Sequence, residues 1–322
     1  MNKKDSDNLD IDVSFVMSVY NKEYYLPAVL DALLGQTGLK NPEFIFIDDL
    51  SKDKSVEIIR ERTKNIKNVV LVAKDVNEGI SITVNQGIMR ARGKWVRMLD
   101  SDDILPLNST EKMIELATLC NADMVYGRYI KTGKEPQEIS HELMKENFSY
   151  NYYKNALDAV LGGHFTRMGQ LIKRDILQRT KGADERVFIQ DESIPLRAAR
   201  LSNGIIKIKE NVVLVPKETN NLSKNTNQLD NDRFFANYYM LKDFALELDK
   251  KTKFKIYKKA ISANWKYVKK NLKNPYFTSD FWYYLITKLF VLEPDFLYLD
   301  KLAKRFLSLD GVLRSKKQDT NI

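Results

Sequence analysis

Short apolar runs alternate with amphipathic stretches along the first hundred residues of the chain. Four runs rich in β-branched residues are predicted to be buried strands: 13–19, 44–47, 69–73 and 95–99. Between them, apolar positions recur every three or four residues, which predicts helices that begin near Asn21, after Asp53 and near Ile80. Strands and helices that alternate at this length predict a parallel sheet with helices on both faces.

The pattern beyond Asp103 is less regular. It predicts a helix at 109–119 and a strand at 124–129, and then an irregular polar stretch from Lys131 to about Tyr153. A second cluster of elements follows: 162–172, 174–180 and 190–201. From about Asp230 to the end, the pattern is helical and rich in aromatic residues and lysine.

Charge separates the two ends of the chain. Its 322 residues include 52 Lys and Arg and 43 Asp and Glu, and 17 of these bases but only 6 of the acids lie from Lys250 onward. A nearly neutral body with a basic tail predicts that the tail meets something anionic. The single cysteine, Cys120, excludes an intrachain disulfide or a thiolate zinc site, and fits a reducing compartment. The N-terminus lacks the apolar stretch of a signal peptide, and no run reaches the ~18 apolar residues of a spanning helix.

Polar residues follow three of the four predicted strands: Tyr20-Asn21, Asp48-Asp49 and Asp100 to Asp103. Ligands of such sheets bind beyond the carboxyl ends of the strands, so this convergence predicts a binding site. Asp100 and Asp102 are separated by one residue and offer hard oxygen ligands for Mg²⁺ or Mn²⁺, which also bind diphosphate oxygens. Taken in isolation, these residues are better explained as a capped turn before Pro106.

The neighbouring motifs change that interpretation. Asn-x-Gly at Asn77, Asn-x-Gly at Asn85 and Ala-x-Gly at Ala91 precede the strand that ends in Asp-Ser-Asp-Asp. With VMSVYNKEYYLPAVLDALLGQT, EFIFIDDLSKDKS and GQLIKRDILQRTKGADERVFIQDESIPLRAAR, this series resembles the family 2 glycosyltransferases of GT-A fold over roughly residues 12–225. The resemblance implies a GT-A domain at 1–229, with a nucleotide-binding half at about 12–105 and an acceptor half at 106–229. A C-terminal helical region would follow at 230–322.

The resemblance implies a metal-dependent, inverting transfer of a sugar from a nucleotide diphosphate donor, with a UDP-sugar favoured. It places the donor on these residues: Tyr20, Asn21, Asp48, Asp49, Asn77, Gly79, Asp100 and Ser101. Either Asp48 or Asp49 would accept a hydrogen bond from a uracil-type base. Asp100 and Asp102 would hold Mn²⁺ or Mg²⁺, and Asp191 would be the base that takes the proton from the acceptor hydroxyl. As a helix-start residue, Asp191 has a purely electrostatic explanation too, but the surrounding motif favours catalysis.

Three positions depart from the family pattern. Ser18 stands where Pro is usual, Val84 where Arg is usual and Gln190 where Glu is usual. They remove no metal ligand and no base, but they leave the donor nucleotide open. They also keep open the alternative of a non-catalytic protein that binds a nucleotide sugar or a partner.

Other classes fit less well. A nucleotidyltransferase would carry a Gly-rich loop after the first strand, and a dehydrogenase would carry a G-x-G-x-x-G motif after a strand; neither is present. A nucleic-acid binder would need a basic, aromatic surface, and the tail has that composition without a recognisable motif. We therefore expect a glycan or lipid-linked acceptor and no nucleic acid.

Two interpretations of the tail remain open. Its apolar residues recur at helical spacing between Phe254 and Leu272 and are surrounded by lysines; a second apolar group spans 281–290. Basic flanks beside aromatic faces are typical of helices that lie in a membrane interface. The same faces would also suit packing against the catalytic domain or a second copy of the chain. We expect a tail that is partly packed and partly a peripheral anchor, in a cytoplasmic protein that contacts the inner face of the cell membrane.

Overall fold

The computed structural model describes residues 10–144, 149–163, 169–217 and 226–315. The chain forms two compact units. The first unit contains the chain up to Gly182 together with 198–219, and the second contains 183–197 together with 220–322. Each unit is considered by itself below.

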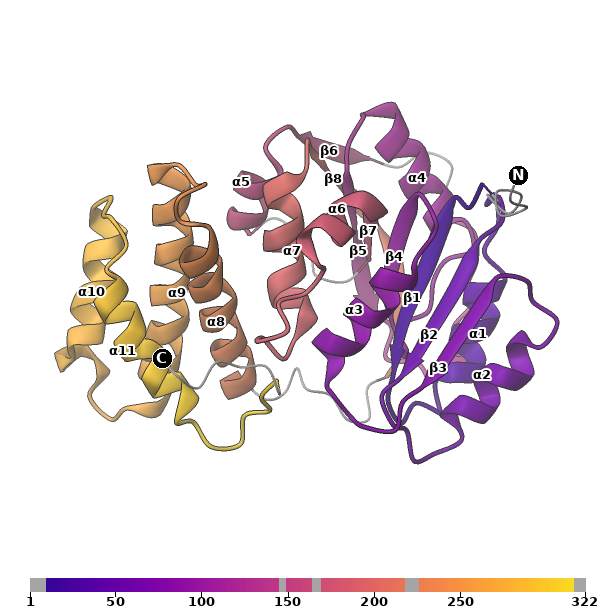
Figure 1. The fold of residues 1–322 in the computed structure, drawn as a ribbon, viewed down its shortest axis with the longest axis horizontal. Coiled ribbons are helices and arrows are strands. Elements are labelled where there is room, and N and C mark those ends of the chain that lie inside the picture. The colour runs from indigo at the N-terminus through magenta and orange to yellow at the C-terminus, as the bar shows by residue number, and fades with distance from the viewer. Residues whose placement is uncertain (1–9, 145–148, 164–168, 218–225, 316–322) are drawn as a thin grey trace, which may run out of the picture. The chain divides into compact units, whose positions relative to one another are not determined.

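A single eight-stranded sheet forms the centre of the first unit (Figure 1). Its strands, in spatial order, are β3 (Val69–Ala73), β2 (Glu43–Asp48), β1 (Val13–Val19), β4 (Trp95–Asp100), β7 (Gln170–Lys173), β5 (Met124–Lys131), β8 (Ile205–Val215) and β6 (Tyr150–Tyr153). The first four strands are parallel, and β5 is parallel to β8. β7 runs antiparallel to both its neighbours, and β6 runs antiparallel to β8. The sheet is therefore mostly parallel, as predicted.

Helices cover both faces of this sheet because side chains alternate along each strand. Phe15 and Met17 belong to a core that also contains residues of α1 (Leu26–Leu34), α2 (Ser55–Thr63) and α4 (Ser109–Leu119). Val16 points the other way, toward α3 (Ile80–Arg90), where a Cβ on Gly87 would lie 2.4 Å from its Cγ1. Glycine at this position therefore lets α3 lie directly on the strands.

Several elements differ from the prediction. β5 extends two residues further, to Lys131, and α1 begins at Leu26 rather than near Asn21. The edge strand β6 lies within the stretch predicted to be irregular, and β8 was not predicted. The remaining short elements are η1 (Pro136–Glu138), α5 (Ala156–Leu161) and α6 (Arg174–Thr180).

The second unit is helical. Its elements are α8 (Thr226–Phe244), α9 (Lys250–Asn271), η3 (Pro275–Phe277), α10 (Ser279–Leu289), α11 (Phe296–Leu307) and the first residues of α7 (Gln190–Leu201). Stacked aromatic rings fill its interior: the ring of Phe234 lies 4.6 Å from that of Phe306 and 5.7 Å from that of Tyr238. Within the described residues, no helix is long and apolar enough to cross a membrane.

The apolar face predicted for α9 is buried in this interior. Its side chains are at most 8% exposed up to Val268: Phe254, Tyr257, Ile261, Trp265 and Val268. Only Leu272, which follows the helix, is 46% exposed. This face of α9 is therefore covered by other helices of the same unit, an arrangement that neither interpretation of the tail named.

Candidate active site

The turns after β1 and β2 are fastened together by reciprocal hydrogen bonds. The Asn21 amide N–H donates to Ser51 Oγ at 2.9 Å, and the Lys52 amide N–H donates to Asn21 Oδ1 at 2.8 Å. Asn21 has φ of 51°, a left-handed conformation that asparagine tolerates better than most residues. This locked turn explains why α1 begins only at Leu26. It also leaves Tyr20 projecting from the end of β1 with its side chain 49% exposed.

The two carboxylates at the end of β2 have different partners. Asp49 accepts the backbone N–H groups of Glu78 and Gly79, one on each oxygen and both at 2.9 Å. Asp48 Oδ2 accepts the Ser51 amide at 3.0 Å, whereas Asp48 Oδ1 is buried without a hydrogen-bond partner. Asp49 therefore holds the start of α3, and Asp48 keeps an oxygen that no described group satisfies.

A buried lysine ties the same region together. Lys74 Nζ lies 2.6 Å from Asp49 Oδ1 and 3.0 Å from Glu78 Oε2, and it donates to Thr83 Oγ1 at 2.9 Å. The bond from Lys74 lowers the pKa of Glu78 below its ordinary value. Asn77 Nδ2 donates to the Asp49 carbonyl at 3.0 Å, and Gly79 has φ of 90° where α3 begins. Asn77 and Gly79 thus build the wall beside Asp49.

The loop after β4 carries the two proposed metal ligands. The Asp103 amide donates to the Asp100 carbonyl at 3.1 Å and closes the turn; Ser101, inside it, is only 3% exposed. The Asp102 side chain is 29% exposed and forms an ion pair with Lys22. Burial, together with the charge of Asp102, raises the pKa of Asp100, although Lys22 opposes the shift.

Lys22 faces both carboxylates from the turn after β1. Burial acts to lower the pKa of this lysine, but Asp102 and Asp100 outweigh it and hold the pKa above its ordinary value. No local sequence pattern indicates this role, because Lys22 and Asp102 are 80 residues apart and meet only in the folded sheet. Lys22 therefore joins the site as a residue that sequence reasoning missed.

The two carboxylates suit a hard divalent cation whose remaining ligands come from the substrate and from water. Among the described residues, no group of three or more His, Cys, Asp or Glu side chains is arranged to hold a metal ion by itself. Mg²⁺ and Mn²⁺ sites of substrate phosphates commonly use one or two carboxylates and complete the shell with phosphate oxygens and water. Two carboxylates, one of them partly open to solvent, fit that arrangement.

Asp191 lies in the second unit, near the start of α7, and is partly buried. The segment that carries it is bound to α8 on either side. The Ile189 amide donates to Asp232 Oδ2 at 2.9 Å, and Arg233 Nε lies 3.2 Å from Glu192 Oε1. The C-terminal helices therefore hold the segment of the proposed base, a role that the sequence pattern did not indicate.

Arg186 is a third attachment of this segment. It bonds Asp184 at 2.7 Å, forms an ion pair with Asp243 of α8, and its guanidinium carbon lies 3.8 Å from the centre of the Tyr239 ring. Asp184 also lies 3.6 Å from Arg197. These contacts fix both ends of the segment 183–197 within the second unit.

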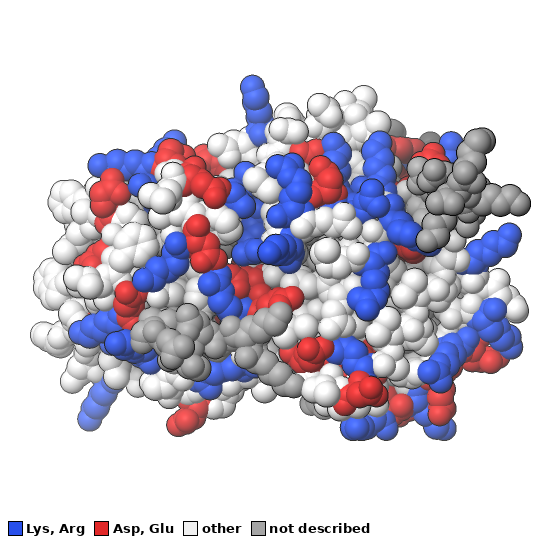
Figure 2. Space-filling model, in the orientation of Figure 1, with Lys and Arg blue, Asp and Glu red and all other residues white. Residues whose placement is uncertain are grey.

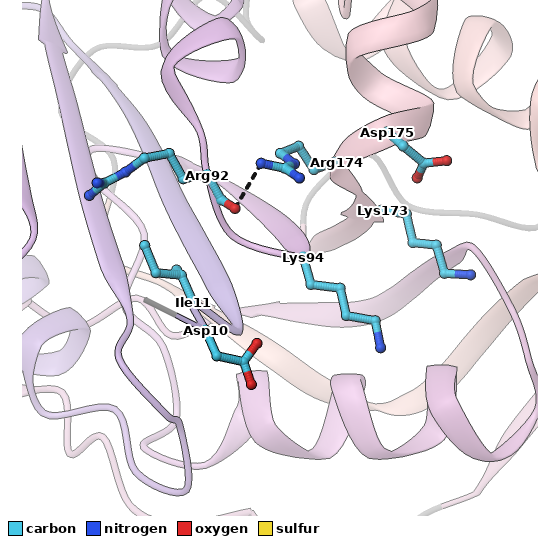
Figure 3. A pocket seen from close by; sticks show the side chains of 7 residues that line it. All are labelled: Asp10, Ile11, Arg92, Lys94, Lys173, Arg174 and Asp175. Atoms are coloured by element: carbon cyan, nitrogen blue, oxygen red, sulfur yellow. Dashed lines mark hydrogen bonds between the residues drawn. The ribbon is translucent and has the colours of Figure 1, made fainter. Parts of the chain in front are cut away.

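A hollow of about 610 Å³ lies at the other end of the strands, beside the amino ends of β1 and β4 (Figure 3). Three of the four cationic side chains that line it are engaged. Arg174 Nη1 donates to the Arg92 carbonyl at 2.8 Å, Arg92 Nε lies 2.6 Å from Glu43 Oε1, and Lys173 Nζ lies 2.6 Å from Asp123 Oδ1. We interpret these contacts as links that hold the strand ends together. The candidate active site is therefore the one at the carboxyl ends of β1, β2 and β4.

Known proteins resemble this chain in sequence. Residues 14–181 match the model of Glycosyl transferase family 2. An uncharacterized glycosyltransferase of Haemophilus influenzae is 31% identical over 166 residues, which are 52% of this chain and 64% of that protein. The minor teichoic acid biosynthesis protein GgaB of Bacillus subtilis is 33% identical over 115 residues, 35% of this chain but 12% of that protein. The chain thus spans less than two thirds of both. An uncharacterized glycosyltransferase of Methanocaldococcus jannaschii is 25% identical over 88% of this chain and 90% of its own length.

Solved structures share the fold at low sequence identity. Residues 1–349 of Staphylococcus aureus TarS superpose with a TM-score of 0.63 and 16% identity, over 87% of this chain and 79% of that one. The same TarS fragment in complex with UDP-GlcNAc gives 0.58 and 15%, over 82% and 83% of the two chains. A Pyrobaculum calidifontis mannosyltransferase in complex with GDP-Man and Mn²⁺ gives 0.55 and 13%, over 95% and 91%.

Proposed function

Because the chain belongs to glycosyl transferase family 2, we propose that it transfers a hexosyl group from a nucleotide diphosphate donor, with a UDP-sugar favoured. The observation that carries the proposal is the meeting of three strand ends at one edge of the sheet. There the turn after β1, the carboxylates after β2 and the loop after β4 are joined by direct contacts, among them the Lys22–Asp102 ion pair.

The donor nucleotide would lie over the ends of β1 and β2. Tyr20, whose ring is half exposed, would cover the base or the ribose. Asp48 is favoured over Asp49 as the acceptor from a uracil-type base, because Asp49 already accepts backbone N–H groups on both oxygens. Asn21, Asn77 and Gly79 would shape this wall through their backbone and amide contacts. Ser101 would keep the Asp100 loop in its turn.

The diphosphate would lie beside the loop after β4. Asp100 and Asp102 would hold Mn²⁺ or Mg²⁺, which supplies Lewis-acid stabilisation of the leaving nucleoside diphosphate when bound. Lys22 adds a further positive charge at the same place, where negative charge develops as the sugar leaves. The Pyrobaculum calidifontis mannosyltransferase, which shares the fold, was solved in complex with GDP-Man and Mn²⁺, and this supports two carboxylates as the cation's ligands here.

Asp191 would accept the proton of the acceptor hydroxyl as the new C–O bond forms. An alcohol is too weak an acid to ionise beforehand, so a carboxylate contributes by taking the proton in the transition state. The donor residues belong to the first unit, and Asp191 belongs to the second. The division into a GT-A domain at 1–229 and a helical region at 230–322 remains part of the proposal.

The acceptor we propose is a glycan or a lipid-linked glycan. The printed role of GgaB in teichoic acid biosynthesis supports this class, since GgaB is 33% identical to this chain over 115 residues. A cytoplasmic enzyme with peripheral contact to the inner face of the membrane, or one that forms homo-oligomers, would suit such an acceptor.

A donor screen tests the proposal. Purified protein is incubated with UDP-, GDP- and dTDP-sugars, with and without Mn²⁺, and the release of nucleoside diphosphate is measured. We expect release from a UDP-sugar that depends on Mn²⁺, and a loss of about a hundredfold or more in the Asp191→Asn variant with donor binding retained. Asp102→Asn should lose both release and Mn²⁺-dependent UDP binding while its thermal unfolding stays that of the parent. Binding without any release would identify a non-catalytic member of the family.

A further inference from the structure

Helix α10 turns its apolar side chains outward. Trp282, Ile286, Leu289 and Phe290 recur at the spacing of one helix face and are 57%, 41%, 66% and 61% exposed. Val291, which follows the helix, is 64% exposed. We call these five residues the α10 patch. Its side of the second unit is mostly white in Figure 2, with charged side chains at its borders.

Two polar residues of the same helix point inward. Asp280 and Thr287 are 3% and 1% exposed. Asp280 accepts hydrogen bonds from Asn264 Nδ2 of α9 at 2.8 Å, and from Tyr298 and Arg305 of α11 at 2.7 and 2.8 Å. A buried carboxylate with three donors cannot rotate into solvent without leaving those donors unsatisfied.

A second contact fixes the same orientation. Tyr283 stacks on Tyr298 of α11 with ring centres 3.6 Å apart, and its hydroxyl donates to Asp295 at 3.1 Å. The helix is therefore held with its apolar face in water by specific contacts to both neighbours. Because burial of large apolar side chains strongly favours association, such a face is expected where a protein meets an apolar partner.

The charges near the patch select the kind of partner. From Leu272 to Leu292, the charged side chains are Lys273, Asp280 and Lys288; both lysines are exposed, whereas Asp280 is buried and paired. The next acid, Glu293, lies 3.3 Å from Lys250 Nζ. The patch is thus bordered by positive charge that its own segment does not neutralise.

We infer that the α10 patch lies in the interface of a membrane that contains anionic lipid. Tryptophan and phenylalanine beside lysine are the composition that interfacial helices use, with the apolar face among acyl chains and the ammonium groups at the phosphates. A two-fold contact between copies would instead bring Lys288 of each copy to the same interface. The inference rests on the proposed function in one respect, the lipid-borne acceptor that makes membrane contact useful.

Vesicle flotation tests the inference. The full chain is mixed at low salt with vesicles of phosphatidylcholine alone, or of equal parts phosphatidylcholine and phosphatidylglycerol, and the fraction that floats is measured. We expect flotation with the mixed vesicles only. The variant Trp282→Ser/Leu289→Ser should lose it, and Lys273→Glu/Lys288→Glu should bind at least twentyfold more weakly, because each nearby lysine contributes roughly fivefold.

Matched controls remove the same groups elsewhere. Leu119→Ser/Leu246→Ser also removes two exposed apolar side chains, and Lys67→Glu/Lys94→Glu changes the net charge equally. Both controls should float like the parent, and circular dichroism should show that all four variants are folded. A chain ending near Leu229 is a poorer test, because the cut falls inside α8, which anchors the segment of Asp191.

Three results would overturn the inference: a parent that stays at the bottom with both kinds of vesicle, a patch variant that floats like the parent, or a parent dimer in solution that the patch variant converts to monomer. The last would assign the patch to a contact between copies. Release of UDP in detergent-free solution is measured for every variant, so a failure of membrane binding is distinguished from a failure of the proposed transferase.

Discussion

Lys22 competes directly for one of the proposed metal ligands. Its ammonium group is paired with Asp102 and lies close enough to Asp100 to influence its pKa. A divalent cation between the two carboxylates would meet this positive charge, which must then turn toward the diphosphate. Lys22 would thus offset one of the two carboxylate charges before the donor binds and contact the donor afterwards.

We therefore expect Lys22→Ala to bind Mn²⁺ about tenfold more tightly than the parent when no nucleotide is present, because a like charge at short range opposes the cation. Isothermal titration of the nucleotide-free protein with Mn²⁺ measures this. Lys52→Ala is the control, since it removes an exposed lysine from the adjoining turn without touching Asp102. Equal Mn²⁺ affinities for parent and Lys22→Ala would contradict this role.

Asp232 of α8 is a buried carboxylate that accepts only uncharged donors. Ile189 N and Gln228 Nε2 bond its Oδ2 at 2.9 Å, and Asn231 Nδ2 bonds its Oδ1 at 2.8 Å. Burial, partly offset by these bonds and increased by Glu192, raises its pKa from 3.8 to about 6. The folded protein therefore holds this proton more tightly than the unfolded chain, and its stability falls as pH rises from about 4 to 6.

Asp232→Asn should remove that loss. Asn231 Oδ1 is a buried oxygen without a hydrogen-bond partner among the described residues. When the side-chain amide of Asn231 flips, this oxygen can accept a hydrogen bond from the introduced amide. We expect the variant to be more stable than the parent at pH 8 by on the order of 2–3 kcal/mol, and to lose the advantage near pH 4. Urea unfolding at both pH values measures the difference. The exposed Asp310→Asn should follow the parent at both; a variant that matches the parent at pH 8 would show that Asp232 carries no such cost.

Among single residues, the sequence predicted the carboxylates of the candidate site better than the groups that these carboxylates contact. Asp48, Asp49, Asp100 and Asp102 were recognisable because each follows a buried strand, where an unpaired charge needs an explanation. Which oxygen of Asp48 stays unsatisfied depends on contacts between distant segments, which no local pattern encodes.

Among the elements, β8 and β6 are the strands that the sequence pattern did not predict. β8 reads IIKIKENVVLV, so a polar stretch interrupts it. Its pairing with β5 is irregular beside Arg128, where the register shifts on both sides. Such a bulge disturbs the period of two that identifies a strand. β6 lies at the sheet edge with largely exposed side chains and has no apolar face to predict it from.

The contact between α8 and the segment of Asp191 gives a prediction for these elements. Arg186→Ala would remove the ion pair with Asp243 and the stacking on Tyr239, which loosens the position of the proposed base. We expect kcat to fall about tenfold, the change for roughly 1.4 kcal/mol of lost positioning, with Mn²⁺-dependent UDP binding unchanged.

Lys242→Ala is the matched control, because Lys242 also lies on α8 but forms its ion pair with Asp300 of α11, at 2.9 Å. It should keep the kcat of the parent. Hydrogen exchange of 183–197 should quicken only in Arg186→Ala. An Arg186→Ala enzyme with normal turnover would show that these contacts do not position the base.

At the scale of the whole molecule, the family match and the first run of the first compact unit end at almost the same residue. The match ends at residue 181, and the first run of the first unit ends at Gly182. The next fifteen residues belong with the C-terminal helices, although the sequence pattern places them in the sheet-forming part of the chain. The sequence pattern predicted that the tail is helical and basic. It did not predict that the tail holds the segment of Asp191, because that contact depends on pairs of distant residues such as Arg233 and Glu192.

The roles proposed for the carboxylates go with a definite stereochemistry of the reaction. Asp191 is proposed to act on the acceptor, and Asp100 and Asp102 are proposed to hold a cation beside Lys22. The resemblance to the family implies that the acceptor oxygen attacks the anomeric carbon in a single displacement, as the nucleoside diphosphate leaves from the opposite face. An α-linked nucleotide sugar should therefore give a β-linked product, which proton NMR of the anomeric signal identifies. Retention of the α configuration would require a covalent or front-face mechanism, and Asp191 would then need a different role from that of a base.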